Sequence, residues 1–244
     1  MDLIYVRPDE MQTLYGTVAT TAGATDSDYL DEWICDGRAG RPARATSGTV
    51  TWSITNPSME VGLVAVCHCN ADVNATIGGG VSGTVIAGAL QANGIRLNGF
   101  LAVAPTAITN LTVAFSGAAS AVVLGEIIAG KRRTLTRPVY TEDETTVDDF
   151  TRTVDVDLAS IPPYDAGLEG RTWSGSFVVD STERDNILAW FRAQRAGTRP
   201  SLVIPIETVN DAWVCFLRRP TFRPVSGRHW SVSLTIDEVP RVRW

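Results

Sequence analysis

The stretch Thr49-Val50-Thr51-Trp52-Ser53-Ile54-Thr55 alternates polar and apolar side chains with a period of two. Successive side chains of a strand point to opposite faces of a sheet, so this pattern is typical of an antiparallel strand with one buried face. Further short apolar or alternating runs follow at 61–69, 73–77, 81–90, 95–103, 111–115 and 121–129. Turn-forming residues such as Gly78-Gly79-Gly80 separate them. Regularly spaced short strands predict a β-sandwich or jelly roll.

The C-terminal part of the chain predicts an antiparallel sheet with one helix. Trp173, Phe177 and Val179 share one face of a strand, and another strand is expected at 151–158. Asp180 can cap a helix that runs to Gly197, with Glu183 at capping-box spacing. Further strands are predicted at 201–206, 212–218 and 230–236. The predicted fold class is therefore all-β with one helix in the C-terminal unit: a jelly-roll β-sandwich plus an antiparallel β domain.

A change of composition near Arg137-Pro138 marks the best candidate for a domain boundary. The segment 141–146 is polar and acidic and joins two apolar regions. The 244 residues also exceed the commonest domain size of roughly 100–150 residues. We therefore predict an N-terminal arm and jelly-roll domain at 1–136 and the antiparallel domain at 137–244.

Composition and charge exclude several classes of protein. With 44% hydrophobic and 20% charged residues, the chain resembles ordinary soluble globular proteins. The net charge is −6 and the basic residues are scattered, whereas a protein that follows nucleic-acid phosphates is normally basic. The first residues lack the pattern of a secretory signal, and no apolar run reaches the roughly 18–20 residues that span a bilayer. We expect synthesis in the cytoplasm, no membrane insertion and no nucleic-acid specificity.

Residue patterns of catalysis are missing from the sequence. The histidines are His68 and His229, and neither lies in an HExxH motif, nor is a GxSxG motif present. We expect His68 at the surface or between subunits. The acidic pairs Asp148-Asp149 and Asp155-x-Asp157 are more typical of solvated strand faces than of a glycosidase dyad. We expect no enzymatic activity and no cofactor.

The cysteines match neither a paired zinc motif nor a dense disulfide framework. They are Cys35, Cys67, Cys69 and Cys215, and free thiols in buried positions are the expectation. Cys67 and Cys69 would point to the same face of one strand, which makes them weak candidates for metal ligands.

Two aromatic residues are candidates for contact with a glycan. Tyr29 and Trp33 lie in a loop-like acidic segment, whereas Trp52 alternates with apolar residues and is expected in the core. Jelly rolls with exposed aromatic rings can hold sugars by stacking and hydrogen bonding.

Several stretches resemble known families. Residues 170–177, 180–197, 202–205 and 230–240 look like the hub domain of distal tail and minor tail proteins of long-tailed bacteriophages. Residues 29–44 and 61–70 resemble galactose-binding-like jelly rolls of tail-tip proteins, which carry a His-Asn pair in that strand. Here Cys69 separates His68 from Asn70, so the role of that pair does not carry over directly.

The resemblance implies a structural virion protein of the tail tip or baseplate, made in the host cytoplasm. It implies a ring of identical subunits that contacts the tail-tube, tape-measure and tip proteins, with the C-terminal unit carrying oligomerisation. Glu142 and Asp143 on one side and Arg218 and Arg219 on the other are candidates for contacts between subunits. The alternative is a carbohydrate-binding, lectin-like module that recognises a host-surface glycan.

Overall fold

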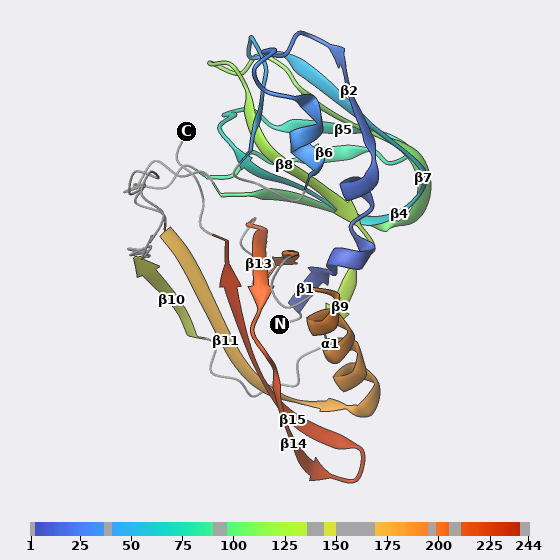
Figure 1. Ribbon diagram of the computed structural model, residues 1–244, viewed down its shortest axis with the longest axis vertical. Coiled ribbons are helices and arrows are strands. Elements are labelled where there is room, and N and C mark those ends of the chain that lie inside the picture. The colour runs from blue at the N-terminus through green and yellow to red at the C-terminus, as the bar shows by residue number, and fades with distance from the viewer. Residues whose placement is uncertain are drawn as a thin grey trace, which may run out of the picture.

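The computed structural model describes residues 3–36, 41–89, 97–135, 144–149, 169–194, 199–204 and 211–239. Within these residues, two antiparallel β-sheets and one α-helix make up the fold, with the first sheet above the second in Figure 1. Short 3-10 helices connect some strands: η1 (Pro8–Glu10), η2 (Gln12–Tyr15) and η3 (Asp31–Cys35). The predicted fold class is confirmed.

The first sheet forms the jelly-roll unit. In the described residues its strands are β2 (Thr17–Ala22), β3 (Ala43–Arg44), β4 (Val50–Cys69), β5 (Ala75–Gly79), β6 (Gly83–Val85), β7 (Gly99–Phe115) and β8 (Val123–Gly130). Their order is β3-β8-β4-β7-β5-β6, and β2 pairs with β4. The sheet curls around a core that includes Trp52, Ile54, Leu111 and Val113.

Strands β4 and β7 are longer than the sequence predicts. The expected strands at 47–55 and 61–69 are one continuous strand, as are those at 95–103 and 111–115. The register between β4 and β7 shifts between Thr55 and Met59 and again between Val61 and Leu63. Asn56, Pro57 and Ser58 therefore form a bulge that bends the strand without ending it.

The second sheet contains strands from both ends of the chain. In the described residues its order is β10 (Glu144–Asp149), β11 (Glu169–Asp180), β15 (His229–Glu238), β13 (Trp213–Leu217), β12 (Ser201–Ile204), β1 (Leu3–Val6) and β9 (Arg133–Leu135). A further strand, β14 (Thr221–Ser226), pairs with β15 and forms the hairpin at the bottom of Figure 1. The strand expected at 151–158 lies outside the described residues.

The helix α1 (Ser181–Ala193) begins where the sequence predicts. The Asp180 side chain accepts a hydrogen bond of 2.8 Å from the backbone N–H of Glu183. Ile187 and Trp190 are buried against the second sheet, and the Trp190 ring stacks on Tyr5 of β1 at 4.3 Å between ring centroids. Gly197, the expected end, lies outside the described residues. None of the helices that the structure describes has the length and apolar character that a bilayer-spanning helix needs.

The boundary predicted at residue 136 does not separate the two sheets. Strand β1 pairs with β12 and with β9, so residues 3–6 and 133–135 belong to the C-terminal sheet. The reason is burial on two faces: Leu3 and Tyr5 pack on the α1 side, whereas Ile4 and Val6 pack toward the jelly roll. A four-residue strand with no polar face gives no alternating signal in the sequence. The division into domains at 1–136 and 137–244 stays a prediction.

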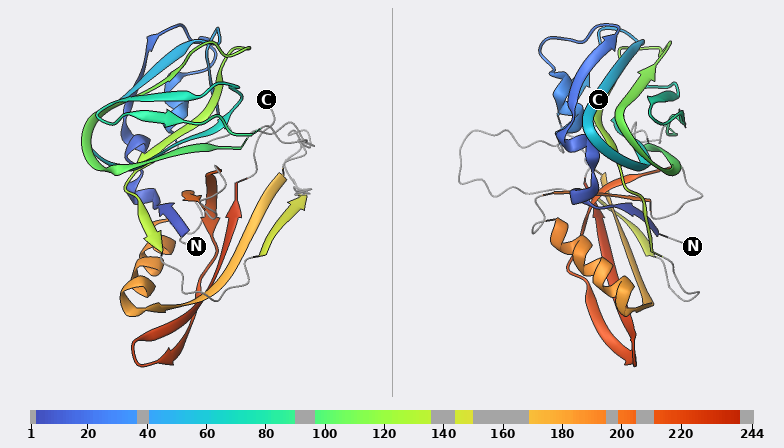
Figure 2. Two further views of the ribbon diagram at one scale, coloured as in Figure 1. Left: turned by 180° about the vertical axis from the view of Figure 1, so that it is seen from behind. Right: turned by 90° about the vertical axis from the view of Figure 1, so that its right-hand side faces the viewer.

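A third hydrophobic core joins the two units. The jelly roll contributes four buried side chains to it: Leu63, Ala65, Cys67 and Ile128. The second unit contributes Ile4, Val6, Leu202, Ile204, Ala212 and Val214. Part of the second sheet thus lies between α1 and the jelly roll, and the views in Figure 2 show α1 on one face of that sheet. This arrangement explains why the run from Val61 to His68 is buried throughout.

Candidate functional site

A groove of about 410 Å³ lies where β4 ends and β8 begins. The residues that line it are Tyr29, Pro42, Arg44, Asn70, Ser120, Ala121 and Val123. They come from four separate segments: the turn before η3, the strand β3, the residue after β4 and the start of β8. Antiparallel pairing of β3 and β4 with β8 brings these segments together.

The floor of the groove is fixed by hydrogen bonds. The Asn70 side chain donates to the carbonyl of Ala121 at 3.0 Å and accepts from the backbone N–H of Val123 at 2.7 Å. The backbone N–H of Asn70 also donates to the Val123 carbonyl at 3.1 Å. Because these bonds hold its amide group in place, Asn70 shapes the groove.

Aromatic rings and arginines lie in the groove and beside it. The guanidinium carbon of Arg44 lies 5.9 Å from the centroid of the Tyr29 ring. Next to it, the rings of Tyr29 and Trp33 meet edge to face at 6.3 Å, and the guanidinium carbon of Arg41 lies 5.8 Å from the Trp33 ring. Both rings are half-buried and both arginines are exposed. The result is a surface row in which two neighbouring aromatic rings lie between two cationic donors.

Asp31 fixes the segment that carries the two rings. Its carboxylate accepts from the Trp52 indole at 3.1 Å, and from the backbone N–H and hydroxyl of Thr20 at 3.2 and 2.7 Å. Ile34 and Cys35, which follow in η3, are buried in the jelly-roll core. The row of rings is therefore attached to the core on both sides of Trp33.

A second groove, of about 550 Å³, lies where β4 and β7 bend. Its lining is Pro57, Ser58, Gly79, Gly80, Ala107, Ile108, Thr109 and Asn110. Among the described residues, none that lines it is charged or aromatic. It is larger than the first groove but offers fewer groups that could distinguish a ligand.

The expectation that Cys67 and Cys69 share a face is wrong. Cys67 packs in the core between the two units, whereas Cys69 packs against the jelly-roll core. The backbone at His68 has a φ of 54°, and this left-handed residue interrupts the alternation of side chains. In the part of the chain that the structure describes, no cluster of three or more His, Cys, Asp and Glu side chains could hold a metal ion.

His68 is buried, contrary to the expectation of a surface or inter-subunit position. Its backbone N–H donates to the Asn98 side chain at 2.8 Å. His229 is exposed at the hairpin. The two histidines lie on different sheets, on β4 and β15.

The candidates for contacts between subunits are only partly described. Glu142 and Asp143 lie outside the described residues. Arg218 and Arg219 are exposed, and Arg218 forms an ion pair of 2.5 Å with Asp237 of the same chain. The role of these four residues in contacts between subunits stays a prediction.

The sequence analysis singled out the two rings beside this groove but not the neighbouring Arg44. Tyr29 and Trp33 lie together as aromatic residues at the surface, next to the groove. Arg44 received no role, although the run Arg41-Pro42-Ala43-Arg44 directly follows the aromatic segment. Nothing in the sequence marks Ser120 as a candidate site residue, since a serine near a glycine is typical of an ordinary loop.

Comparisons with known proteins give weak similarities in structure alone. No family model matches the sequence, and no curated protein matches it. A Streptococcus pneumoniae fucose binding module, SpX-3, has a TM-score of 0.39 at 11% identity over 50% of this chain and 97% of that one. CpGH89CBM32-5 from Clostridium perfringens, solved with GalNAc-β-1,3-galactose, has a TM-score of 0.40 at 9% identity over 50% of this chain and 99% of that one.

The crystal structure of SpGH29 is matched with a TM-score of 0.40 at 12% identity. That match covers 51% of this chain but 28% of the other. Similarities of this size carry no argument about what this chain binds, so its function has to be argued from its own residues.

Proposed function

We propose that the chain is a non-catalytic binding protein whose jelly roll recognises carbohydrate in the groove beside Tyr29. The observation that supports this proposal is the pairing of the half-buried Tyr29 ring with the exposed Arg44 guanidinium over a floor fixed by hydrogen bonds. A sugar ring presents apolar C–H groups on its faces and hydroxyls at its rim. An aromatic face and a planar donor, held side by side, complement these two features.

In this proposal each wall residue has a separate role. The Tyr29 ring stacks on one face of the sugar, and Arg44 donates to a pair of neighbouring hydroxyls or to an acidic substituent. Trp33 with Arg41 offers a second such position along the same surface, 6.3 Å from Tyr29 between ring centroids. A site with two positions suits a glycan of at least two sugar units.

The lining of the groove also supports binding without turnover. Hydrolysis of a glycoside generally needs two carboxyl groups on either side of the scissile bond. Among the described residues, the charged residue that lines the groove is Arg44, and no carboxylate lines it.

Binding to a glycan array tests the proposal. We expect the wild-type chain to bind a defined set of glycans, and Tyr29→Ala and Arg44→Ala each to weaken binding by about tenfold or more. Tyr29→Phe retains the ring and should retain most of the affinity. Arg223→Ala, an exposed arginine on the β14–β15 hairpin, is the matched control. Binding that all these variants retain, or no binding to any glycan, would refute the proposal.

A second candidate function is structural, as a component of a phage tail tip that assembles through the C-terminal sheet. The resemblance of residues 170–177, 180–197, 202–205 and 230–240 to tail hub domains supports it, and so does the β14–β15 hairpin, in which every β14 residue except Phe222 is exposed. Val225 at its end is 57% exposed. A strand that buries so little of itself is typical of a segment that acquires partners by assembly. The two functions are compatible because they use different sheets.

Electron microscopy of the full chain, alone and with its tail-tube protein, tests this second candidate. Rings with an open lumen are the expected result. A monomer under every condition would contradict it and leave the carbohydrate proposal unaffected.

A further inference from the structure

Asn98, the residue before β7, makes four hydrogen bonds, and three of them connect the jelly roll to the second unit. Its backbone N–H donates to Asp211 at 2.9 Å, and its side-chain amide donates to the Ala212 carbonyl at 2.7 Å. The Ala212 N–H donates back to the Asn98 carbonyl at 2.8 Å. On the jelly-roll side, the Asn98 side-chain oxygen accepts from the N–H of His68 at 2.8 Å. Asn98 is 1% exposed, so these bonds form away from water, where leaving one unmade is costly.

The backbone of His68 is arranged for this contact. Cys67 pairs with Glu126 and Cys69 with Leu124, whereas the left-handed His68 between them directs its N–H to Asn98. A non-glycine residue in this conformation is strained and persists only where its surroundings favour it. The buried hydrogen bond from the His68 N–H to Asn98 favours this backbone conformation.

The residues that Asn98 contacts in the second sheet are themselves fixed. Asp211 pairs with Arg171 at 2.6 Å and accepts from the Trp213 indole at 3.2 Å. Arg171 also donates to Glu238 at 2.7 and 2.8 Å and lies 4.3 Å from the centroid of the Trp213 ring. Burial opposes the charge of Arg171, but the hydrogen bonds and charges of Glu238 and Asp211 outweigh it and raise the pKa of Arg171. Asn98 is thus bonded to a charged cluster that spans three strands.

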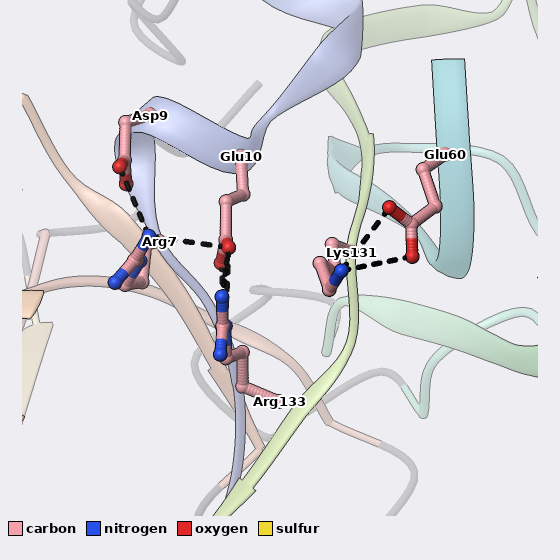
Figure 3. Close-up of polar contacts among 6 residues, drawn as sticks. All are labelled: Arg7, Asp9, Glu10, Glu60, Lys131 and Arg133. Carbon is pink, nitrogen blue, oxygen red and sulfur yellow. Dashed lines mark hydrogen bonds and ion pairs between the residues drawn. The ribbon is translucent and has the colours of Figure 1, made fainter. Parts of the chain in front are cut away.

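A second polar contact fixes the two connections between the sheets. Figure 3 shows Glu10, which follows β1, between Arg7 and Arg133. The Arg133 guanidinium donates to the Glu10 carboxylate at 2.9 and 3.1 Å, and Arg7 donates at 3.2 Å. The Arg133 bonds join the first connection, after β1, to the start of β9, where the second connection, between β8 and β9, ends. Lys131 in the second connection pairs with Glu60 of β4 at 3.0 Å.

The apolar contacts and the hydrogen bonds between the two units have different effects on how the units are oriented. The apolar core between the units holds them together, but the hydrophobic effect is non-directional and tolerates rotation of one surface over another. Buried hydrogen bonds require alignment of donor and acceptor and therefore select one orientation. Asn98 is bonded to both units at once, at the start of a long jelly-roll strand.

We propose that Asn98 is a positioning residue that fixes the orientation of the jelly roll on the second sheet, so that the two units act as one rigid body. It follows that the groove beside Tyr29 points in one direction relative to the C-terminal hairpin. This last consequence rests on the proposed carbohydrate function, but the rigid coupling itself does not.

Distances between spin labels on the two units test the proposal. Labels are placed at Thr76→Cys on β5 and Thr182→Cys on α1, both exposed, in a chain with Cys69→Ser. We expect a narrow distance distribution for the otherwise native chain and a broadened or shifted one for Asn98→Ala. Val113→Ala is the control, since it weakens the jelly-roll core without touching the junction. The control should leave the distribution narrow, which separates orientation from general loss of stability.

A narrow, unshifted distribution in folded Asn98→Ala protein would overturn the proposal. If Asn98→Ala fails to fold, Asn98→Asp is the second variant in which the distance distribution is measured. This variant retains the acceptor for the His68 N–H. It loses the side-chain donor to Ala212 and adds a charge beside Asp211. Broadening in Asn98→Asp supports the proposal, and an unchanged distribution refutes it. Neither readout depends on a glycan, so failure here is distinguishable from failure of the binding proposal.

Discussion

At the scale of single residues, Asp31 connects the candidate site to the core. Its carboxylate satisfies the indole N–H of Trp52, a fully buried ring, and holds Thr20 on the neighbouring strand. Removal of this acceptor leaves a buried donor without its partner, which typically costs about 1–3 kcal/mol.

Asp31→Ala should therefore lower the free energy of unfolding by about 1–3 kcal/mol and also weaken glycan binding, because η3 loses its attachment. Denaturant titration monitored by tryptophan fluorescence measures the first effect. Asp28→Ala, at an exposed position nearby, is the control and should change stability little. Equal stability of the two variants would show that the Asp31 bonds contribute nothing.

The cysteines give a second prediction at this scale. Burial raises the pKa of Cys35 and Cys215 well above the usual thiol range, and nearby carboxylates act in the same direction. In the folded chain these thiols stay neutral, whereas in the unfolded chain they ionise above about pH 8.5. The unfolding free energy that they contribute is thus fully present below that pH and falls as the pH rises further.

Reaction with a thiol reagent at pH 8 should label the half-buried Cys69 first, while Cys35, Cys67 and Cys215 react only as the chain unfolds. Cys69→Ser should remove the fast phase. Rapid labelling of Cys35 or Cys215 in the native chain would contradict the burial that the structure assigns to them.

At the scale of secondary-structure elements, α1 is the one whose start the sequence predicts best. Capping is local: Asp180 and Glu183 are three positions apart, so the signal is contained in one short stretch. Asp180→Ala should lower the free energy of unfolding by about 1 kcal/mol, and Asp180→Ser should restore most of it. Thermal denaturation measures both, with Asp185→Ala, exposed within the helix, as the control. An equal loss of stability in Asp185→Ala would show that the effect of Asp180→Ala is not due to loss of the helix cap.

The elements that the sequence did not predict have physical reasons in common. Strands β1 and β9 are short and pair with segments far away in the chain, so neither periodicity nor length marks them. Strands β4 and β7 run through bulges, where the alternation of side chains is interrupted. Local alternation predicts that strands exist, but the pairing partners determine where each one ends.

The same limit applies to the candidate site. The rings of Tyr29 and Trp33 were identifiable because aromatic residues in an acidic, loop-like segment are unusual. Arg44, Asn70 and Ser120 meet them only after β3, β4 and β8 have paired. The contacts of Asn98 could not be predicted from local sequence either, because Asp211 lies 113 positions away along the chain.

At the scale of the whole molecule, shared cores predict cooperative unfolding. The core between the units contains side chains from β1, β4, β8, β12 and β13, so neither sheet can unfold without exposing apolar surface of the other. Calorimetry of the full chain should therefore show a single transition, with equal calorimetric and van't Hoff enthalpies. Two separate transitions would instead indicate that the units are independent.

The central claim is that the groove beside Tyr29 is where the chain binds carbohydrate. The most direct test is a titration of the isotope-labelled chain with the glycan that binds best on the array, followed by backbone amide chemical shifts. We expect the largest changes at four residues that line the groove, Tyr29, Arg44, Asn70 and Ser120. Changes centred on the other groove, at Ser58, Gly80 and Thr109, or no saturable change anywhere, would contradict it.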